Sequence, residues 1–293
     1  MNAPGAAADR HVPIAGMLWM LAATVFFSLS FTLVKGLQDA GLTVFQAILF
    51  RQLLGTTIVL PVMLGSDVAT LKTAIPFQHA KRATLGFLGM CTGYYSLVLI
   101  NVGDSVALQF TLPIFTMIAA VLILGEKILS HRLIATLIGF AGILIIVRPG
   151  FAELNLGIMM ALSSAAFHAV SDTYARYLSR YDKVPTIMGF NFLFTIPLAA
   201  IPAVIYWEPV SLDIWPLLLA FGMAGISAQY CLTRSFSLAE ASLVSPILFF
   251  RLPIVAVISW YAFDQLTEIW TWVGAGVIAI ATTWMARVEV RKG

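Results

Sequence analysis

The sequence predicts an all-α integral membrane protein of ten transmembrane helices, built from two inverted repeats of five helices each. Three observations predict this fold: an apolar composition, a series of long apolar runs, and a similarity between the two halves of the chain. Of the 293 residues, 60% are apolar and 11% are charged, and the mean hydropathy is +0.93. Soluble domains average roughly 45–50% apolar and 25% charged residues. A protein surface of this composition requires lipid rather than water as its solvent.

The apolar runs are separated by glycine, proline, asparagine, aspartate or charged residues. A bilayer core of about 30 Å requires roughly 20 residues of helix, so a chain of this length holds about ten spans with short connections. Because backbone polar groups in lipid need partners within the protein, each run is predicted to be a helix. The predicted spans are residues 13–35, 42–64, 83–101, 104–124, 132–148, 155–179, 184–207, 213–234, 240–263 and 268–287.

Basic residues predict the orientation of the chain, because loops rich in lysine and arginine stay on the cytoplasmic side. With a cytoplasmic N-terminus and ten crossings, only Lys35 and Arg148 fall outside the membrane on the far side, while Arg51 and Arg251 lie within spans. We therefore expect both termini to be cytoplasmic, as tails of residues 1–12 and 288–293. The basic residues assigned to the cytoplasmic side are Arg10, Lys72, Lys81, Arg82, Lys127, Arg132, Arg176, Arg180, Lys183, Arg234, Arg287, Arg291 and Lys292.

The two halves of the chain resemble each other. Residues 16–35 align without gaps to residues 157–176, and the identities include Gly16 with Gly157. The predicted repeats are residues 13–148 and 155–287. Five crossings are an odd number, so the second repeat enters the membrane from the opposite side. Inverted repeats of this kind are typical of secondary transporters whose binding site lies at the repeat interface near the midplane.

These features resemble the drug/metabolite transporter superfamily, specifically its EamA-type members with two five-helix repeats. The resemblance covers nearly the whole chain and rests on the order and spacing of several short motifs. EamA-type sequences usually have glutamate at the position of Asp264. The motifs are Phe50-Arg51, LGEK at residues 124–127, SPILFFRLP at 245–253, Phe263-Asp264, and WTWVG at 270–274.

The resemblance implies a bacterial inner-membrane protein that moves small organic metabolites by alternating access without ATP. Export of amino acids is the leading expectation, with YddG-type exporters of aromatic amino acids as the nearest candidates. Uptake of riboflavin, or of another planar metabolite such as S-adenosylmethionine, is the alternative. The sequence leaves the oligomeric state open, a monomer included.

Two arginines lie deep inside predicted spans. By the rise of a helix, Arg51 is about 14 Å and Arg251 about 16 Å from the start of its span, near the bilayer centre. A guanidinium at that depth needs a partner or a watery cavity, and its planar fork suits a carboxylate. The alternative is a structural arginine that satisfies helix-end carbonyls or a buried acid.

Four further side chains complete the predicted substrate-binding set. Tyr95 and Tyr230 occupy equivalent positions, where rings with a polar edge would stack on a planar solute, although such aromatics also simply pack. His168 lies four residues before Asp172 on one helical face, an arrangement suited to proton transfer. For Asp172 a local ion pair with Arg176 is the favoured alternative. The full set is Arg51, Tyr94, Tyr95, His168, Tyr230 and Arg251.

Other residues are assigned to structure rather than to binding. The family resemblance implies that Glu126 and Asp264 tie helix ends together. Gly86, Gly89 and Gly93 recur on one helical face, where they would permit close helix approach.

Several signatures are missing from the sequence. It has no G-x-x-x-x-G-K-[ST] phosphate loop, no H-E-x-x-H zinc motif and no G-x-S-x-G elbow. We therefore expect no enzyme, no catalytic residue, no metal and no cofactor, and no nucleic-acid partner. The expected partners are a small-molecule substrate and the lipid bilayer. An intramembrane enzyme would need clustered titratable groups, and a passive channel would need a continuous polar stripe.

Overall fold

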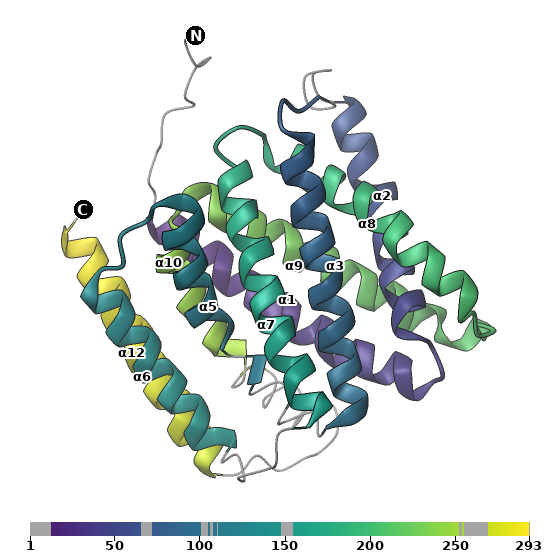
Figure 1. Ribbon diagram of the computed structural model, residues 1–293. Coiled ribbons are helices and arrows are strands. Elements are labelled where there is room, and N and C mark those ends of the chain that lie inside the picture. The colour runs from purple at the N-terminus through teal and green to yellow at the C-terminus, as the bar shows by residue number, and fades with distance from the viewer. Residues whose placement is uncertain are drawn as a thin grey trace.

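The computed structural model describes residues 13–65, 72–100, 105, 108–109, 111–147, 155–251, 254 and 269–292. Within these ranges the chain is helical and contains no strand, as predicted (Figure 1). The predictions for Asp264 and for residues 1–12 lie outside the described residues. The helices are α1 (Pro13–Asp39), α2 (Val44–Gly65), α3 (Pro76–Leu99), α5 (Leu112–Ala119) with a π-helical turn (Ala120–Leu124), α6 (Ser130–Val147), α7 (Leu156–Leu178), α8 (Val184–Ile205), α9 (Trp215–Leu238) after a 3-10 turn (Leu212–Ile214), α10 (Ala241–Val244) with a 3-10 turn (Ser245–Phe250), and α12 (Ile269–Lys292).

The helices present apolar side chains to their surroundings. Four stretches of the described chain are long and apolar enough to cross a membrane by length and composition, and the stretch Leu112–Leu124 is apolar but shorter. Large apolar side chains such as Leu122, Val204 and Ile280 are more than two-thirds exposed. A continuous apolar exterior of this kind marks a surface in contact with lipid. The four stretches are Pro13–Asp39, Val44–Pro61, Val184–Ile205 and Leu212–Leu238.

The helices pack in pairs that join the two halves of the chain. Helix α1 packs along α9, α3 along α7, α2 along α8, and α6 along α12. In Figure 1 the α6–α12 pair forms one edge of the bundle and the α2–α8 pair lies at the other side. The α1–α9 and α3–α7 pairs lie between them. The centre of the bundle is therefore built by both halves.

Small residues allow α3 and α7 to approach closely. A Cβ atom added at Gly89 would lie 2.8 Å from the ring of His168, and one at Gly93 would lie 2.6 Å from Oγ of Ser164. The Ser164 hydroxyl also donates a hydrogen bond of 2.8 Å to the carbonyl of Gly89. The prediction that glycines on this face permit close helix packing is confirmed.

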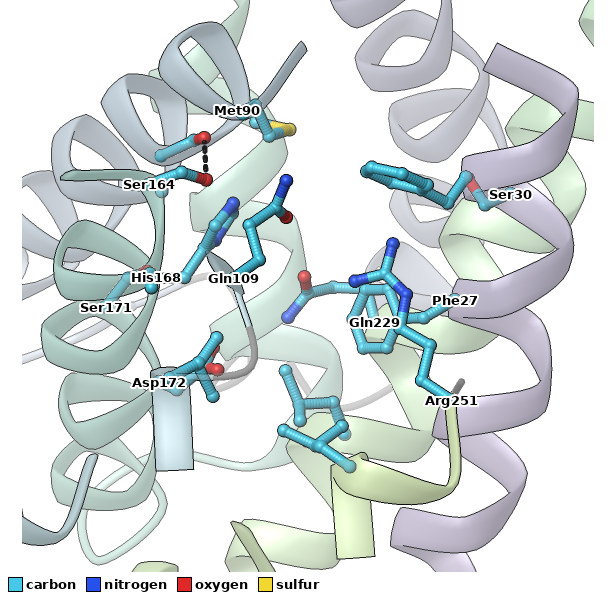
Figure 2. A pocket seen from close by; sticks show the side chains of 18 of the residues that line it. Phe27, Ser30, Met90, Gln109, Ser164, His168, Ser171, Asp172, Gln229 and Arg251 are labelled. Atoms are coloured by element: carbon cyan, nitrogen blue, oxygen red, sulfur yellow. Dashed lines mark hydrogen bonds between the residues drawn. The ribbon is translucent and has the colours of Figure 1, made fainter. Parts of the chain in front are cut away.

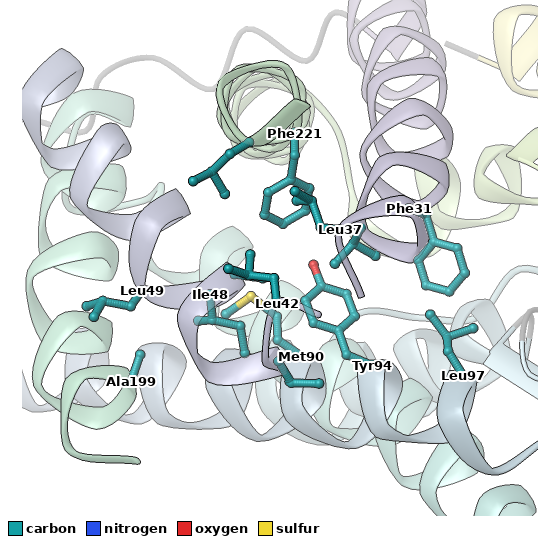
Figure 3. Packing of buried hydrophobic residues seen from close by; sticks show 14 of the residues in the cluster. Phe31, Leu37, Leu42, Ile48, Leu49, Met90, Tyr94, Leu97, Ala199 and Phe221 are labelled. Carbon is teal, nitrogen blue, oxygen red and sulfur yellow. The ribbon is translucent and has the colours of Figure 1, made fainter. Parts of the chain in front are cut away.

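A cluster of buried apolar side chains joins α1, α2, α3, α8 and α9 (Figure 3). Leu37, Ile48 and Phe221 are fully buried within it, and Tyr94 is 7% exposed. Because lipid tails are as apolar as these side chains, the cluster stabilises the bundle by close packing rather than by removal from water. It fixes α2 and α3 against each other and so positions the residues that line the centre.

Replacement of Gly16 by alanine is expected to destabilise the contact between α1 and the end of α9. The added Cβ would lie 2.5 Å from the Cβ of Ala239, closer than two carbon atoms can approach. The backbones must then separate and strain the 2.7 Å hydrogen bond from Ser235 to the Gly16 carbonyl. Overpacking of this kind costs about 1–3 kcal/mol. A lower melting temperature of the purified protein in detergent would reveal it.

Gly276→Ala is the matched control, since among the described residues no atom beyond its own stretch of helix lies within 4 Å of a Cβ at that position. Equal melting temperatures for the two variants would contradict the close contact between α1 and α9.

Candidate functional site

A cavity lies at the centre of the bundle, between the helix pairs (Figure 2). The space that the centre of a water molecule can occupy inside this cavity is about 120 Å³. One water needs about 10–15 Å³ by the same measure, so the cavity has room for a small organic molecule. Side chains from both halves line it. The charged and polar residues among them are Ser30, Arg51, Arg82, Tyr94, Gln109, Ser164, His168, Ser171, Asp172, Asn191, Gln229 and Arg251.

Arg51 of α2 lies in the cavity, and its guanidinium has few hydrogen-bond partners among the described residues. Its side chain is 6% exposed and runs along α9 at Gly225, where a Cβ atom would lie 2.8 Å from Nε. One terminal nitrogen donates to the sulfur of Met90 at 3.4 Å, and a thioether is a weak acceptor. The Nε atom is buried and finds no hydrogen-bond partner in the described part of the chain. Within the described residues no carboxylate lies within ion-pair distance of this guanidinium.

Arg251 follows the 3-10 turn after α10 and projects into the same cavity, beside Gln229 (Figure 2). Its guanidinium carbon lies 4.2 Å from the centre of the Phe31 ring, a cation–π contact. Its Nε is also buried and has no hydrogen-bond partner among the residues that the structure describes. In the part of the chain that the structure describes, Arg251 has no acidic partner. The two arginines picked out by their depth in the sequence therefore share one cavity.

Helix α7 forms the opposite wall of the cavity. His168 and Asp172 point into it one turn apart, as Figure 2 shows. Arg51 and Arg251 act electrostatically on His168, and Arg82 of α3 acts on Asp172. The cavity thus carries charges of both signs, with Arg82 near Asp172, and Arg51 and Arg251 on other elements.

The structure does not contain the expected local ion pair between Asp172 and Arg176. Arg176 donates a hydrogen bond of 2.8 Å to the carbonyl of Phe236, and its Nε lies 3.9 Å from a carboxylate oxygen of Glu126. Asp172 faces the cavity and has Arg82 as its charged neighbour. The expected pairing is wrong because tertiary neighbours outcompete the residue one turn away.

The predicted tyrosines divide between the cavity and the outside of the bundle. Tyr94 lines the cavity, whereas Tyr95 is 38% and Tyr230 42% exposed. Tyr95 packs edge-on against Phe45, with ring centres 5.9 Å apart. Adjacent helical residues point about 100° apart, so the inward positions are those one residue earlier. Of the three predicted tyrosines, Tyr94 lines the cavity, whereas Tyr95 and Tyr230 do not, and Gln229 lines it next to the position of Tyr230.

Arg82 is a cavity residue that sequence reasoning placed in a cytoplasmic loop. Helix α3 begins at Pro76 rather than at residue 83, so Arg82 lies inside the helix and is 2% exposed. Its guanidinium donates to the carbonyl of Ile187 on α8 at 3.1 Å. Proline at the first position of a helix is a known start signal, and Pro76 could have predicted the earlier start.

Charged residues tie the two halves together at one end of the bundle. Gly125, with a φ of 68°, ends the π-helical turn, and Glu126 then accepts a 3.4 Å hydrogen bond from the backbone N–H of Ala241. Arg132 of α6 forms an ion pair with Glu240, directly before α10. Together with the contact between Glu126 and Arg176 described above, these bonds join the ends of several helices. Glu126 therefore ties helix ends together as predicted.

Comparisons with known proteins agree with this architecture. The model of the EamA-like transporter family matches residues 14–148 and 155–287. The chain is similar to an S-adenosylmethionine uptake transporter of Rickettsia prowazekii, with 27% identity over 278 residues that cover 94% of each chain. It is 26% identical to a riboflavin transporter of Vibrio cholerae over 97% of this chain and 96% of that one. It is 28% identical to the pseudopaline exporter CntI of Pseudomonas aeruginosa, over 94% and 97%.

A crystal structure of a protein with 17% identity shows the same fold, with a TM-score of 0.77 over 95% of this chain and 98% of that chain. The family match covers both halves, and the similar full-length proteins are transporters of different small molecules. The chain therefore belongs to the EamA-like transporter family and is a multi-pass membrane transporter of small metabolites.

Proposed function

We propose that this chain is a secondary transporter of a small organic metabolite that carries a carboxylate. The observation behind the proposal is the presence of Arg51 and Arg251 in one central cavity without an acidic partner in the described chain. Removing a charge from water costs several kcal/mol unless an opposite charge or hydrogen bonds compensate it. A substrate carboxylate would compensate it, because it accepts two parallel hydrogen bonds from a guanidinium.

We also propose that the chain forms ten transmembrane helices in two inverted repeats, which expose the cavity alternately to the two sides. The helix pairs support this arrangement. If α7 is the equivalent of α1 and α9 is the equivalent of α3, then the α1–α9 pair in one orientation corresponds to the α7–α3 pair in the other. The α2–α8 and α6–α12 pairs each consist of two equivalent helices. A pseudo-two-fold axis through the centre of the bundle would produce this pattern.

Two equivalent glycines support the same relation. Gly16 of α1 faces Ala239 at the end of α9, and Gly157 of α7 faces Ile100 at the end of α3. In both places an added Cβ atom would meet a side-chain carbon at 2.5 Å. Ala239 and Ile100 both have extended backbones, and each donates its N–H to the carbonyl four residues earlier at 3.0 Å. The proposal includes cytoplasmic termini and an inner-membrane location.

The relatives shift the proposed substrate away from amino acid export, which the sequence favoured. Among the molecules named for them, S-adenosylmethionine combines a carboxylate with a planar ring. The carboxylate suits Arg51 and Arg251, and the ring suits the aromatic side chains of Phe27 and Phe31 in the cavity. We place uptake of S-adenosylmethionine or a similar metabolite first, and export of amino acids, including aromatic ones, second.

Riboflavin is a further candidate, favoured by the names of several relatives and by the aromatic lining. It has a planar ring but no carboxylate. Its transport would therefore distinguish a cavity that recognises a ring from one that recognises a carboxylate.

Counterflow into proteoliposomes is expected to favour carboxylate-bearing solutes. Vesicles preloaded with an unlabelled solute should accumulate labelled S-adenosylmethionine or phenylalanine. They should not accumulate the carboxylate-free counterparts, decarboxylated S-adenosylmethionine and phenethylamine. Equal counterflow of a solute and its decarboxylated counterpart would contradict carboxylate recognition. Counterflow of riboflavin alone would contradict carboxylate recognition and support uptake of riboflavin instead.

A further inference from the structure

Asp172 and the two arginines of the proposed function come from different elements around the cavity. Arg251 and Gln229 project from one side, and His168 and Asp172 project from α7 on the other (Figure 2). Asp172 is the one acidic side chain among the lining residues that the structure describes. The proposed function assigns a role to Arg51 and Arg251 but none to the carboxylate of Asp172.

The carboxylate of Asp172 is largely buried, yet it faces the cavity, where it can accept hydrogen bonds from a ligand. The residue is 9% exposed, and within the described ranges the charge of Arg82 acts on it without a hydrogen bond from any protein donor. A carboxylate has about four acceptor positions, and buried acceptors are normally satisfied. An enclosed carboxylate that faces a cavity without a donor is therefore poised for a ligand donor.

The neighbours of Asp172 on the packed elements leave room for such a ligand. On α7, His168 lies one turn before it, and Arg176, one turn after it, is engaged by Glu126 and by a backbone carbonyl. On α3, Arg82 is the charged neighbour, and its guanidinium is partly occupied by a carbonyl of α8. Asn191 of α8 and Gln229 of α9, which also line the cavity, are neutral.

We propose that Asp172 binds a cationic group of the substrate, opposite the arginines that bind its carboxylate, so that the cavity selects zwitterions over simple carboxylates. The inference rests on the proposed function, because it assigns the second charged end of the same substrate. The chemical class is a metabolite with an ammonium or sulfonium group near a carboxylate. A ligand without the cation would strip water from Asp172 and leave it unpaired, which sites of this kind penalise strongly.

Equilibrium binding to the purified protein in detergent tests the proposal with three labelled probes. These are S-adenosylmethionine, phenylalanine, and 3-phenylpropionate, which is phenylalanine without its ammonium group. The wild-type protein is expected to bind phenylalanine at least tenfold more tightly than 3-phenylpropionate. In Asp172→Asn this ratio should fall to about one, and the affinity for S-adenosylmethionine should fall at least tenfold. Asp172→Glu, which keeps the charge, should recover part of the ratio.

Asp213→Asn is the control for loss of an acidic charge, since Asp213 is exposed in the turn before α9. The wild-type ratio needs no variant and is decisive even where Asp172→Asn folds poorly. A ratio near one in the wild-type protein, or an unchanged ratio in Asp172→Asn, would overturn the role of Asp172 and leave carboxylate recognition standing. Failure of the wild-type protein to bind any of the three probes would overturn both proposals.

Discussion

Arg251→Gln is expected to lower counterflow of the carboxylate-bearing substrate at least tenfold. The substitution removes a charged donor whose guanidinium is buried at Nε and has no acidic partner in the described chain. A hydrogen bond to a charged group contributes about 1.5–3 kcal/mol, which corresponds to roughly ten- to hundredfold in binding. Arg251→Lys keeps the charge but loses the planar fork and the stacking on Phe31, so an intermediate rate is expected.

Arg180→Gln is the matched control, because Arg180 is exposed in the turn after α7. Its counterflow should equal that of the wild-type protein. A wild-type rate in Arg251→Gln, from protein that elutes as a single species, would contradict the assignment of Arg251 to the substrate carboxylate.

Glu126→Gln is expected to destabilise the bundle strongly. The side chains of Glu126 and Arg176 are each 6% exposed, and their ion pair joins the two halves of the chain. Removing one partner of a buried pair leaves an uncompensated charge and costs about 3–5 kcal/mol. A glutamine at this position would still accept the hydrogen bond from the N–H of Ala241. The loss of stability would therefore come from the missing charge and not from this hydrogen bond. A fall in the melting temperature in detergent measures it.

Glu208→Gln serves as the control, since Glu208 is exposed between α8 and α9. The double variant Glu126→Gln/Arg176→Gln should recover part of the lost stability, because it removes both charges. Identical melting temperatures for Glu126→Gln and Glu208→Gln would show that the pair contributes nothing measurable.

The features that sequence predicted well are those with a high energetic cost in lipid. An arginine within an apolar run is costly enough that it must face a cavity or a partner, and both Arg51 and Arg251 line the cavity. Long apolar runs must be helical for the same kind of reason, and the described residues contain helices and no strands.

The features that sequence missed depend on which helical face points inward. A helix in lipid is apolar on all sides, so periodicity does not reveal its buried face. That is why Tyr95 and Tyr230 were predicted as binding residues together with Tyr94, whereas the residues that line the cavity at these places are Tyr94 and Gln229. Arg82 was placed outside the membrane because a basic residue near a span normally marks a loop, and its partner on α8 is distant in sequence.

Binding of one ligand pair to two proteins tests carboxylate recognition most directly. The ligands are phenylalanine and phenylalaninamide, in which a neutral carboxamide replaces the carboxylate, and the proteins are wild type and Arg251→Gln. We expect the wild-type protein to prefer the acid at least tenfold and Arg251→Gln, which keeps Arg51, to show a clearly smaller preference. The two changes would then be coupled, as expected for groups in contact. A preference of the same size in both proteins would contradict the central claim that Arg251 binds the substrate carboxylate.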